Sequence, residues 1–297
     1  MYTDCGVCFF VHFLNNVRHC EIKKLDLQEG KILGLVGESG SGKSVTSLSI
    51  LGLNDRAESN GSVLFRKKDG NTIDILSSHE KEIQKIRGSE IAMIFQEPGS
   101  ALNPVLRIGR QLEKVLKLHD RKLGRKEAKE KALELLKKAG LRDADSIYRM
   151  FPHELSGGMK QRVVIAISLS SSPTLILADE PTTALDVTIQ DEILDLLRGL
   201  VKDNGVSMIL ISHNLEVISR MADSIAIMRK GTIVEEGMKD EILSDPVHPY
   251  TRHLLEMARD MDGMIHGRLK DEERESVLDF HGYRKLTETH RVLADTK

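Results

Sequence analysis

The sequence predicts an α/β fold with a mainly parallel core sheet, and three observations lead to that prediction. Short apolar runs alternate with stretches that have helical periodicity. One of these runs leads directly into a glycine-rich loop and then into a helical pattern. Another ends at two consecutive carboxylates. Short buried strands that alternate with helices are typical of parallel sheets. Ligands of such sheets bind at the carboxyl ends of the strands.

The expected core strands are the apolar runs at residues 32–36, 90–95, 175–178, 207–211 and 224–228. Residues 6–14 form a further run, in which Val7, Phe9, Val11 and Phe13 alternate with other residues, as in a β-strand. That run is short and follows an aspartate rather than a basic segment, so it is a poor secretory signal. Residues 231–237 predict a small turn and strand after the core. These outer strands suggest an antiparallel β part beside the parallel core.

The middle of the chain is helical in character. Residues 125–139 place one apolar face on a helix that Gly140 is well placed to end. The residues of that face are Ala128, Ala132, Leu135, Leu136 and Ala139. We expect residues 100–172 to be a helical insertion between two core strands.

The last part of the chain, residues 259–297, is rich in charge and poor in periodic hydrophobic residues. It contains no convincing strand, so we expect an appended segment with some helix or partial disorder. Its histidines, His266, His281 and His290, are scattered, which favours solvated surface positions over a metal site.

Composition narrows the classes of function. The 43 Lys and Arg nearly balance the 45 Asp and Glu, for a net charge of −2. No global basic field therefore exists to recruit nucleic acid. Three cysteines fit a reducing cytosol better than a disulfide scaffold. Cys5 and Cys8 form a CxxC near His12 and His19, where a redox pair or metal site is conceivable but incidental cysteines are favoured.

The glycine-rich loop matches the pattern GxxxxGK[ST], which binds the phosphates of nucleoside triphosphates. Glycines let successive backbone N–H groups curl around phosphate oxygens, in front of the positive end of the next helix. Lys43 would reach the β and γ phosphates, and the Ser44 hydroxyl would ligate Mg²⁺. The candidate phosphate-binding residues are Gly37, Glu38, Ser39, Gly40, Ser41, Gly42, Lys43 and Ser44.

Asp179 and Glu180 end the run at residues 175–178. An acidic residue at that place can hold Mg²⁺, usually through water, opposite the serine of the phosphate loop. Its neighbour Glu180 is free to act as the general base that polarises the attacking water. Two consecutive carboxylates would ordinarily be a solvated pair, but their position after a buried strand favours the catalytic interpretation.

A second candidate phosphate site occurs at LSGGMKQR, residues 155–162. Ser156, Gly157 and Gly158 offer a hydroxyl and bare backbone amides just before a predicted helix at residues 159–169. One nucleotide needs only one such site, so the second one requires an explanation.

The order of these motifs resembles the nucleotide-binding domain of ATP-binding-cassette (ABC) proteins over residues 7–258. The resemblance rests on the P-loop, Gln96 after a strand, LSGGMKQR, DEPTTALD with Ala184-Leu185-Asp186, and His213. It implies a P-loop NTPase of the ABC fold that hydrolyses ATP with Mg²⁺. It also explains the second phosphate site, because two cassettes of this family pack head to tail and clamp each ATP between the P-loop of one and the SGG helix of the other.

The resemblance implies roles for single residues. Gln96 would touch Mg²⁺ or the attacking water and communicate with a membrane partner. Asp186 would make a contact across the dimer, and His213 would contact the γ-phosphate. An aromatic residue upstream of the P-loop should stack on adenine; Phe13 is the favoured candidate and Phe10 the other.

Two further segments resemble the dipeptide, oligopeptide and nickel importers of this family: QEPGSALNP at residues 96–104 and HPYT at residues 248–251. The resemblance implies transmembrane permease subunits, a second ABC ATPase subunit (identical or different) and, indirectly, an extracytoplasmic solute-binding protein. It implies a peripheral position on the cytoplasmic face of the cell membrane. No cysteine follows Cys20, which excludes the cysteine-rich tail of many peptide members and leaves the nickel or metallophore branch open.

The alternative is a soluble ABC-type ATPase that acts on nucleic acid or the ribosome. Chromosome-maintenance types split the cassette with a long coiled coil, and ribosome-acting types carry two cassettes. This sequence has neither feature, so no nucleic-acid partner is expected.

Overall fold

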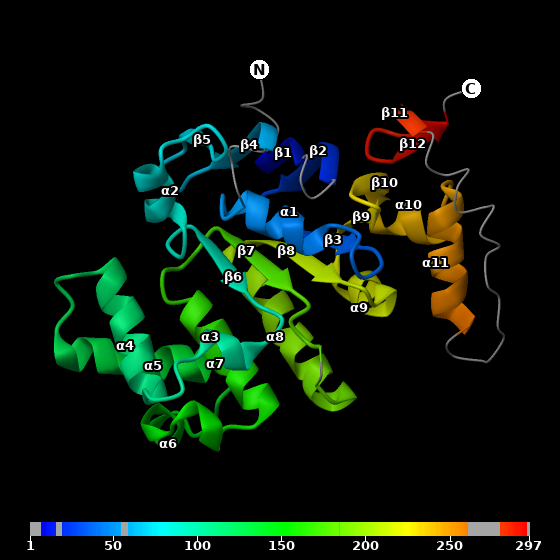
Figure 1. The fold of residues 1–297 in the computed structure, drawn as a ribbon. Helices are drawn as coiled ribbons and strands as arrows, with labels where there is room; N and C mark the ends of the chain where they lie inside the picture. Colours follow the sequence, from blue (N-terminus) through cyan, green and yellow to red (C-terminus); the bar gives the residue numbers. More distant parts are fainter. Residues whose placement is uncertain (1–6, 16–19, 55–58, 184, 261–279, 296–297) are drawn as a thin grey trace.

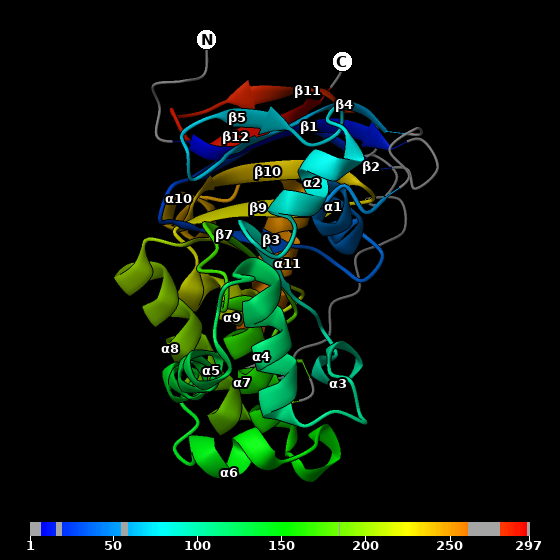
Figure 2. The same cartoon turned by 90° about the vertical axis from the view of Figure 1, so that its left-hand side faces the viewer.

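The computed structural model describes residues 7–15, 20–54, 59–183, 185–260 and 280–295. Its centre is a set of parallel strands joined by helices, with antiparallel strands at one end and a group of helices at the other (Figures 1 and 2). One sheet runs through the molecule in the order β5-β4-β1-β2-β10-β9-β3-β8-β7-β6.

The parallel core consists of five neighbouring strands, β9, β3, β8, β7 and β6. They are the five runs that the sequence predicts: β3 (Ile32–Val36), β6 (Ile91–Ile94), β7 (Leu175–Asp179), β8 (Ser207–Ser212) and β9 (Ser224–Arg229). Residues 175–179 and 207–212 are buried throughout, because layers of side chains cover both faces of the sheet. The prediction of a mainly parallel α/β core is confirmed.

Alternate positions of the core strands contribute to two separate hydrophobic clusters, as the twofold periodicity of a strand requires. On β3, Leu33 and Leu35 pack with α1 (Lys43–Ile50) and the outer strands. Ile32 and Val36 pack on the other side. That side is covered mainly by α7 (Gly157–Ser168), α8 (Val187–Asn204) and α9 (Leu215–Met221).

The antiparallel part consists of β1 (Val7–Asn15), β2 (Cys20–Gln28), β4 (Ser59–Arg66) and β5 (Thr72–Asp74), followed by α2 (Glu80–Ile86). The predicted strand at residues 6–14 corresponds to β1. β10 (Thr232–Met238) pairs antiparallel with β9 and joins β2 at a single pair, Thr232 and Glu21.

A series of helices lies between the parallel neighbours β6 and β7. The series comprises α3 (Pro98–Ala101), α4 (Ile108–His119), α5 (Arg125–Lys138), α6 (Ala144–Arg149), the 3₁₀ turn η2 (Pro152–Glu154) and α7. In α5, Ala128, Ala132 and Leu136 are buried, as the sequence periodicity predicts. Gly140 follows the helix with φ 77°, a left-handed conformation that suits glycine.

The expectation that the tail has no strand is wrong for its described part. After α10 (Lys239–Ser244) and α11 (Pro249–Asp260), β11 (Phe280–Lys285) and β12 (Arg291–Asp295) form an antiparallel pair. β12 continues the sheet by pairing with Glu235 and Glu236 of β10. Strands this short carry little periodicity of their own, and the pairing depends on a partner far away in sequence.

The expectation of a solvated His290 is also wrong, because the side chain is buried and its Nε2 lies 2.7 Å from Oε1 of the buried Glu235. Glu235 also accepts hydrogen bonds from the backbone amides of Val247 and His248. His266 and the side chain of His281 lie outside the described part of the chain, as do the side chains of the CxxC segment.

Candidate nucleotide-binding site

The glycine-rich loop connects β3 to α1, and its geometry requires glycine at two positions. A Cβ on Gly37 would lie 2.1 Å from the carbonyl oxygen of Met228. Gly42 has φ 106°, which side chains with a Cβ rarely adopt. The neighbouring strand therefore holds the loop tightly against the carboxyl end of the sheet.

Lys43 is buried inside this loop. Its Nζ donates hydrogen bonds to the carbonyl oxygens of Gly37, at 2.7 Å, and Glu38, at 2.8 Å. Burial lowers the pKa of the Lys43 ammonium, and the negative charges of Glu180, Asp179 and Glu38 oppose that effect. The ammonium thus lies where it can meet the phosphates of a nucleotide held by the loop.

Two other side chains of the loop fit a phosphate and its metal. The Ser41 hydroxyl is buried and has no hydrogen-bond partner within the described part of the chain. A buried hydroxyl without a partner is costly, and a phosphate oxygen would satisfy it. The Ser44 hydroxyl lies near the Asp179 carboxyl at the end of β7 and lowers its pKa, but burial has the larger effect and raises that pKa. Hydroxyl and carboxylate oxygens are suitable Mg²⁺ ligands, so the pair fits the metal that the fold implies.

Glu180 is the centre of a hydrogen-bonded cluster at the ends of β7 and β8. Its Oε1 lies 2.8 Å from Nδ1 of His213. Its Oε2 accepts hydrogen bonds from Gln96 Nε2 and from the Thr183 hydroxyl, both at 2.9 Å. The structure thus brings together the residues that the sequence proposed for the chemistry of hydrolysis, Glu180, His213 and Gln96.

The backbone of Glu180 is unusual. Its φ of 46° is left-handed, which is uncommon for a residue with a side chain. Its N–H donates to the carbonyl oxygen of Ile211 on β8, at 2.9 Å. Strained conformations of this kind cluster at functional sites, and this one turns the carboxylate toward His213.

Electrostatics keep Glu180 ionised. Burial raises the pKa of its carboxyl, but hydrogen bonds from His213 and Thr183 and the charges of His213 and Lys43 outweigh burial, so the pKa is below its usual value. A carboxylate that stays charged at neutral pH can accept a proton from water.

The SGG segment lies in another part of the molecule than the P-loop, as the positions of α7 and α1 show (Figures 1 and 2). Ser156 caps α7 and accepts a hydrogen bond from the amide of Met159. A Cβ on Gly158 would lie 2.5 Å from the side chain of Ile189 on α8. Asp186 caps α8 through the amide of Ile189. Ser156, Gly157 and Asp186 are exposed, and this face contributes nothing to the P-loop site of its own chain.

Within the residues that the structure describes, no contact tests the other predicted binding residues. Ser39 and Gly40 lie on the exposed part of the loop. Phe13 is in β1, opposite Ile22, but its side chain is outside the described part of the structure, as is Ala184.

Sequence reasoning assigned no role to Tyr250, which touches the P-loop from α11. Its hydroxyl oxygen accepts a hydrogen bond from the amide of Glu38, at 3.4 Å, and the guanidinium of Arg229 lies 4.7 Å from the centre of its ring. Its HPYT segment was recognised only as a mark of a subgroup. Thr183 was likewise missed, although it lies within the recognised DEPTTALD motif.

The parallel sheet, the P-loop and the carboxylates at the end of β7 define a P-loop ATPase. Comparisons with known proteins identify its family. The family model described as ABC transporter matches residues 21–183. An ATP-binding protein of Brucella melitensis that is named for peptide import is 49% identical over 229 residues, or 76% of this chain and 68% of the relative. The oligopeptide transport ATP-binding protein AppD of Bacillus subtilis is 47% identical over 242 residues, or 80% of this chain and 72% of the relative.

Among solved structures, the dimeric ATP-binding cassette MJ0796 in a post-hydrolysis state with ADP and Pi superposes with a TM-score of 0.63 at 30% identity. The match covers 73% of this chain and 88% of that one. The chain therefore belongs to the ABC transporter family and is an ABC-type ATPase. Within the described residues, no helix is both long and apolar enough to span a bilayer.

Proposed function

We propose that this chain is the ATP-hydrolysing subunit of an ABC importer for peptides. The observation that carries the ATPase chemistry is the cluster of Gln96, Thr183 and His213 around the ionised carboxylate of Glu180. The relatives named above, at close to half identity over most of the chain, are named for peptide or oligopeptide import. They favour peptide over nickel or a metallophore, and they give no support to an action on nucleic acid or the ribosome.

In the proposed reaction, Glu180 orients a water molecule for in-line attack on the γ-phosphate and accepts its proton. Lys43 and His213 stabilise the charge that develops on the phosphate oxygens. Ser44, Asp179 and Gln96 would hold Mg²⁺, which would neutralise part of the phosphate charge. The hydrogen bonds from Gln96 and Thr183 hold the Glu180 carboxylate in one orientation, so little reorganisation precedes the attack.

A second cassette completes the site in this proposal. Ser156 and Gly157 are exposed and Gly158 is half-buried at the start of α7, where amides and the positive end of a 12-residue helix can meet the γ-phosphate held by another chain. Asp186 lies at the start of the neighbouring α8 and would make a contact across the dimer. The partner is an identical or a related ATPase subunit, and Phe13 is the proposed adenine-stacking residue.

Transport further requires transmembrane permease subunits and, indirectly, a solute-binding protein. We place the chain on the cytoplasmic face of the membrane as a peripheral subunit. Residues 1–258 would be the nucleotide-binding domain, with the insertion at about residues 100–172 passing motion from Gln96 to the permease. Residues 259–297 would be an extension whose strand β12 is attached to β10.

Two measurements test this proposal. In cells that lack the subunit, uptake of a radiolabelled dipeptide should fall and return when the wild-type gene is restored, but not when a Glu180→Gln variant is. Loss of nickel uptake with normal dipeptide uptake would move the chain to the nickel branch, and loss of neither would overturn the importer assignment. Affinity purification should recover a polytopic membrane protein; recovery of ribosomes or DNA instead would support the alternative.

A further inference from the structure

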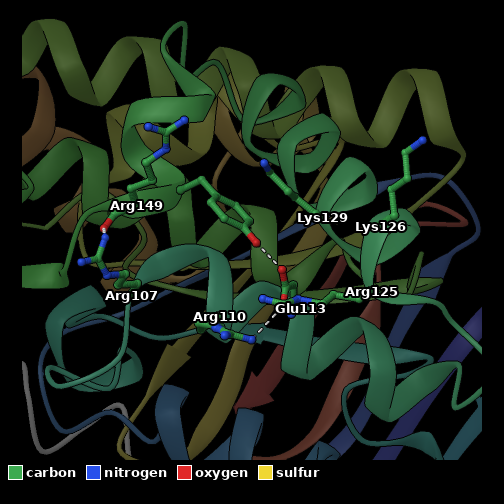
Figure 3. A pocket seen from close by; sticks show the side chains of 8 residues that line it. Arg107, Arg110, Glu113, Arg125, Lys126, Lys129 and Arg149 are labelled. Carbon is green, nitrogen blue, oxygen red and sulfur yellow. Dashed lines mark hydrogen bonds and ion pairs between the residues drawn. The ribbon is translucent and has the colours of Figure 1, made fainter.

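A pocket of about 550 Å³ lies among α4, α5 and α6, apart from the P-loop. Figure 3 shows Arg107 and Arg149 at one end, Lys126 at the other and Glu113 between them. We call it the basic pocket, and its lining residues are Arg107, Arg110, Glu113, Arg125, Lys126, Lys129, Tyr148 and Arg149. Six of these side chains are cationic, although the whole chain carries a net charge of −2. Such a local excess of one charge creates a strong field in a concave site.

The one carboxylate of the basic pocket is already engaged. Glu113 is buried, accepts a hydrogen bond from the Tyr148 hydroxyl and lies 3.6 Å from the guanidinium of Arg110. Burial and the contact with Glu113 raise the pKa of Tyr148 to about 12, so its hydroxyl remains a donor to that carboxylate at neutral pH. Glu113 therefore neutralises at most one of the surrounding cations.

Two other cations of the basic pocket lie on α5 and lack the ion pairs that other lysines of this helix form. On α5, Lys131 pairs with Glu127 at 3.0 Å and Lys138 pairs with Glu134 at 2.9 Å. Lys126 and Lys129 of the pocket form no ion pair with any described carboxylate, although the ammonium of Lys129 lies 5.6 Å from the centre of the Tyr148 ring. No described carboxylate therefore compensates the charge of these two lysines at the edge of the pocket.

Helix electrostatics add to this excess. α5 begins at Arg125, and its N-cap Gly124 provides no side-chain cap. Arg125 and Lys126 place positive charge in the first turn of the helix, where the macrodipole is also positive and where Glu127 is the one acidic residue. α4 follows an N-cap at Arg107 that makes no capping hydrogen bond, and its first turn holds no acidic residue. A bound anion would relieve both repulsions.

We infer that the basic pocket binds an anion that carries a phosphate group. Guanidinium groups carry planar pairs of N–H donors, which match phosphate oxygens. Arg149 and the N–H groups of Arg110 that do not face Glu113 can offer them, whereas Arg107 already donates one N–H to the carbonyl oxygen of Arg149 and lies over the ring of Phe151. Lys126 and Lys129 add mobile point charges at the rim. Two sources have this chemistry, a phospholipid headgroup at a membrane surface and a soluble phosphorylated compound. The site is independent of the proposed transport function.

The test measures binding of two probes on a Lys43→Ala background, which weakens phosphate binding at the P-loop. Sodium pyrophosphate is titrated by calorimetry, and vesicles of phosphatidylcholine with or without phosphatidylglycerol are tested by co-sedimentation. Arg110→Gln with Lys129→Gln is the pocket variant. Lys131→Gln with Lys138→Gln is the matched control, since it removes the same charge from exposed positions of α5 outside the pocket.

We expect the pocket variant to weaken binding of at least one probe by roughly tenfold or more, as the loss of two charge-assisted contacts requires. The control should retain wild-type affinity within about twofold, as surface charges outside a site contribute little. If the pocket variant binds pyrophosphate more weakly than the wild type does, the ligand is a soluble phosphorylated compound. If the variant weakens only the binding of vesicles that contain phosphatidylglycerol, the ligand is a phospholipid headgroup. Failure of both probes to bind, equal weakening by both variants, or equally tight binding of a short polyglutamate peptide would overturn the phosphate assignment. Circular dichroism checks that both variants fold.

Discussion

The carboxylate of Glu180 and Nδ1 of His213 lie 2.8 Å apart, although 33 positions separate the two residues in the chain. Each follows one of two neighbouring parallel strands, β7 and β8, whose carboxyl ends meet at the same edge of the sheet. The contact also helps to hold the pKa of Glu180 below its usual value. The fold thus brings the ionised carboxylate that we propose as the base next to its histidine partner, at the edge of the sheet where the P-loop begins.

Replacement of Glu180 by glutamine should abolish steady-state ATP hydrolysis. Glutamine keeps the size of the side chain and an acceptor for Thr183, but it cannot take a proton from water. We expect turnover to fall by about 100-fold or more, with ATP binding unchanged. Phosphate release and equilibrium binding of a fluorescent ATP analogue measure the two effects. Glu134→Gln, on the exposed face of α5, is the control, and undiminished turnover in Glu180→Gln would refute the assignment of the base.

Tyr250 is predicted to be a positioning residue for the P-loop. Tyr250→Phe removes the acceptor for the Glu38 amide and keeps the ring beneath Arg229. A hydrogen bond of this kind contributes about 0.5–1.5 kcal/mol, so KM for ATP should rise several-fold while kcat changes little. The control is Tyr148→Phe, which removes a hydroxyl bound to Glu113 far from the P-loop. Equal KM values in wild type and Tyr250→Phe would show that α11 does not position the loop.

The pair of Ser44 and Asp179 predicts how hydrolysis depends on Mg²⁺. Asp179→Asn and Ser44→Ala should each raise the Mg²⁺ concentration needed for half-maximal activity, by roughly tenfold for the loss of a charged ligand. Because burial raises the pKa of Asp179, wild-type affinity for Mg²⁺ should decline on acidification earlier than an ordinary aspartate would allow. Titration of MgCl₂ at several pH values measures both effects. An unchanged Mg²⁺ requirement in Asp179→Asn would exclude this carboxylate as a ligand.

The parts of the fold that sequence predicts well are those with a local cause. Residues 32–36 are a continuous apolar run that must be buried on both faces, and Gly37 and Gly42 are required by close approach and by a positive φ. Glu180 could be proposed because it follows such a run directly. Its hydrogen-bonded cluster with Gln96, Thr183 and His213 then forms because neighbouring parallel strands end at the same edge of the sheet.

The parts that sequence misses depend on partners distant in the chain. β12 becomes a strand because β10 offers it an edge, and His290 is buried because Glu235 accepts its hydrogen bond. Tyr250 reaches the P-loop only after α11 packs beside it. Neither His290 nor Tyr250 has a periodic or compositional signal in the sequence that would have revealed its contact.

His248 gives a prediction about stability and pH. The side chain is buried, and its Nδ1 accepts a hydrogen bond from the amide of Tyr250. Burial lowers the pKa of His248 to about 4; the charge of Glu235 opposes that shift and the charge of Arg229 adds to it. The unfolded chain, with an ordinary value of 6.5, binds the proton more readily than the native protein between these two values. Stability that is present above pH 6.5 should therefore be lost as the pH falls toward 4.

The measurement is urea unfolding of wild type and His248→Asn at pH 7.5 and pH 5. Asparagine keeps an acceptor for the Tyr250 amide but has no proton to gain in this range. Protonation of His248 in the unfolded chain should lower the free energy of unfolding of the wild type by about 2 kcal/mol between pH 7.5 and pH 5. The variant should lack that contribution. Comparison at pH 7.5 isolates any packing defect of the variant, because the histidine is neutral there in both states. If the free energy of unfolding falls equally in the two proteins between pH 7.5 and pH 5, His248 does not set the acid sensitivity of this protein.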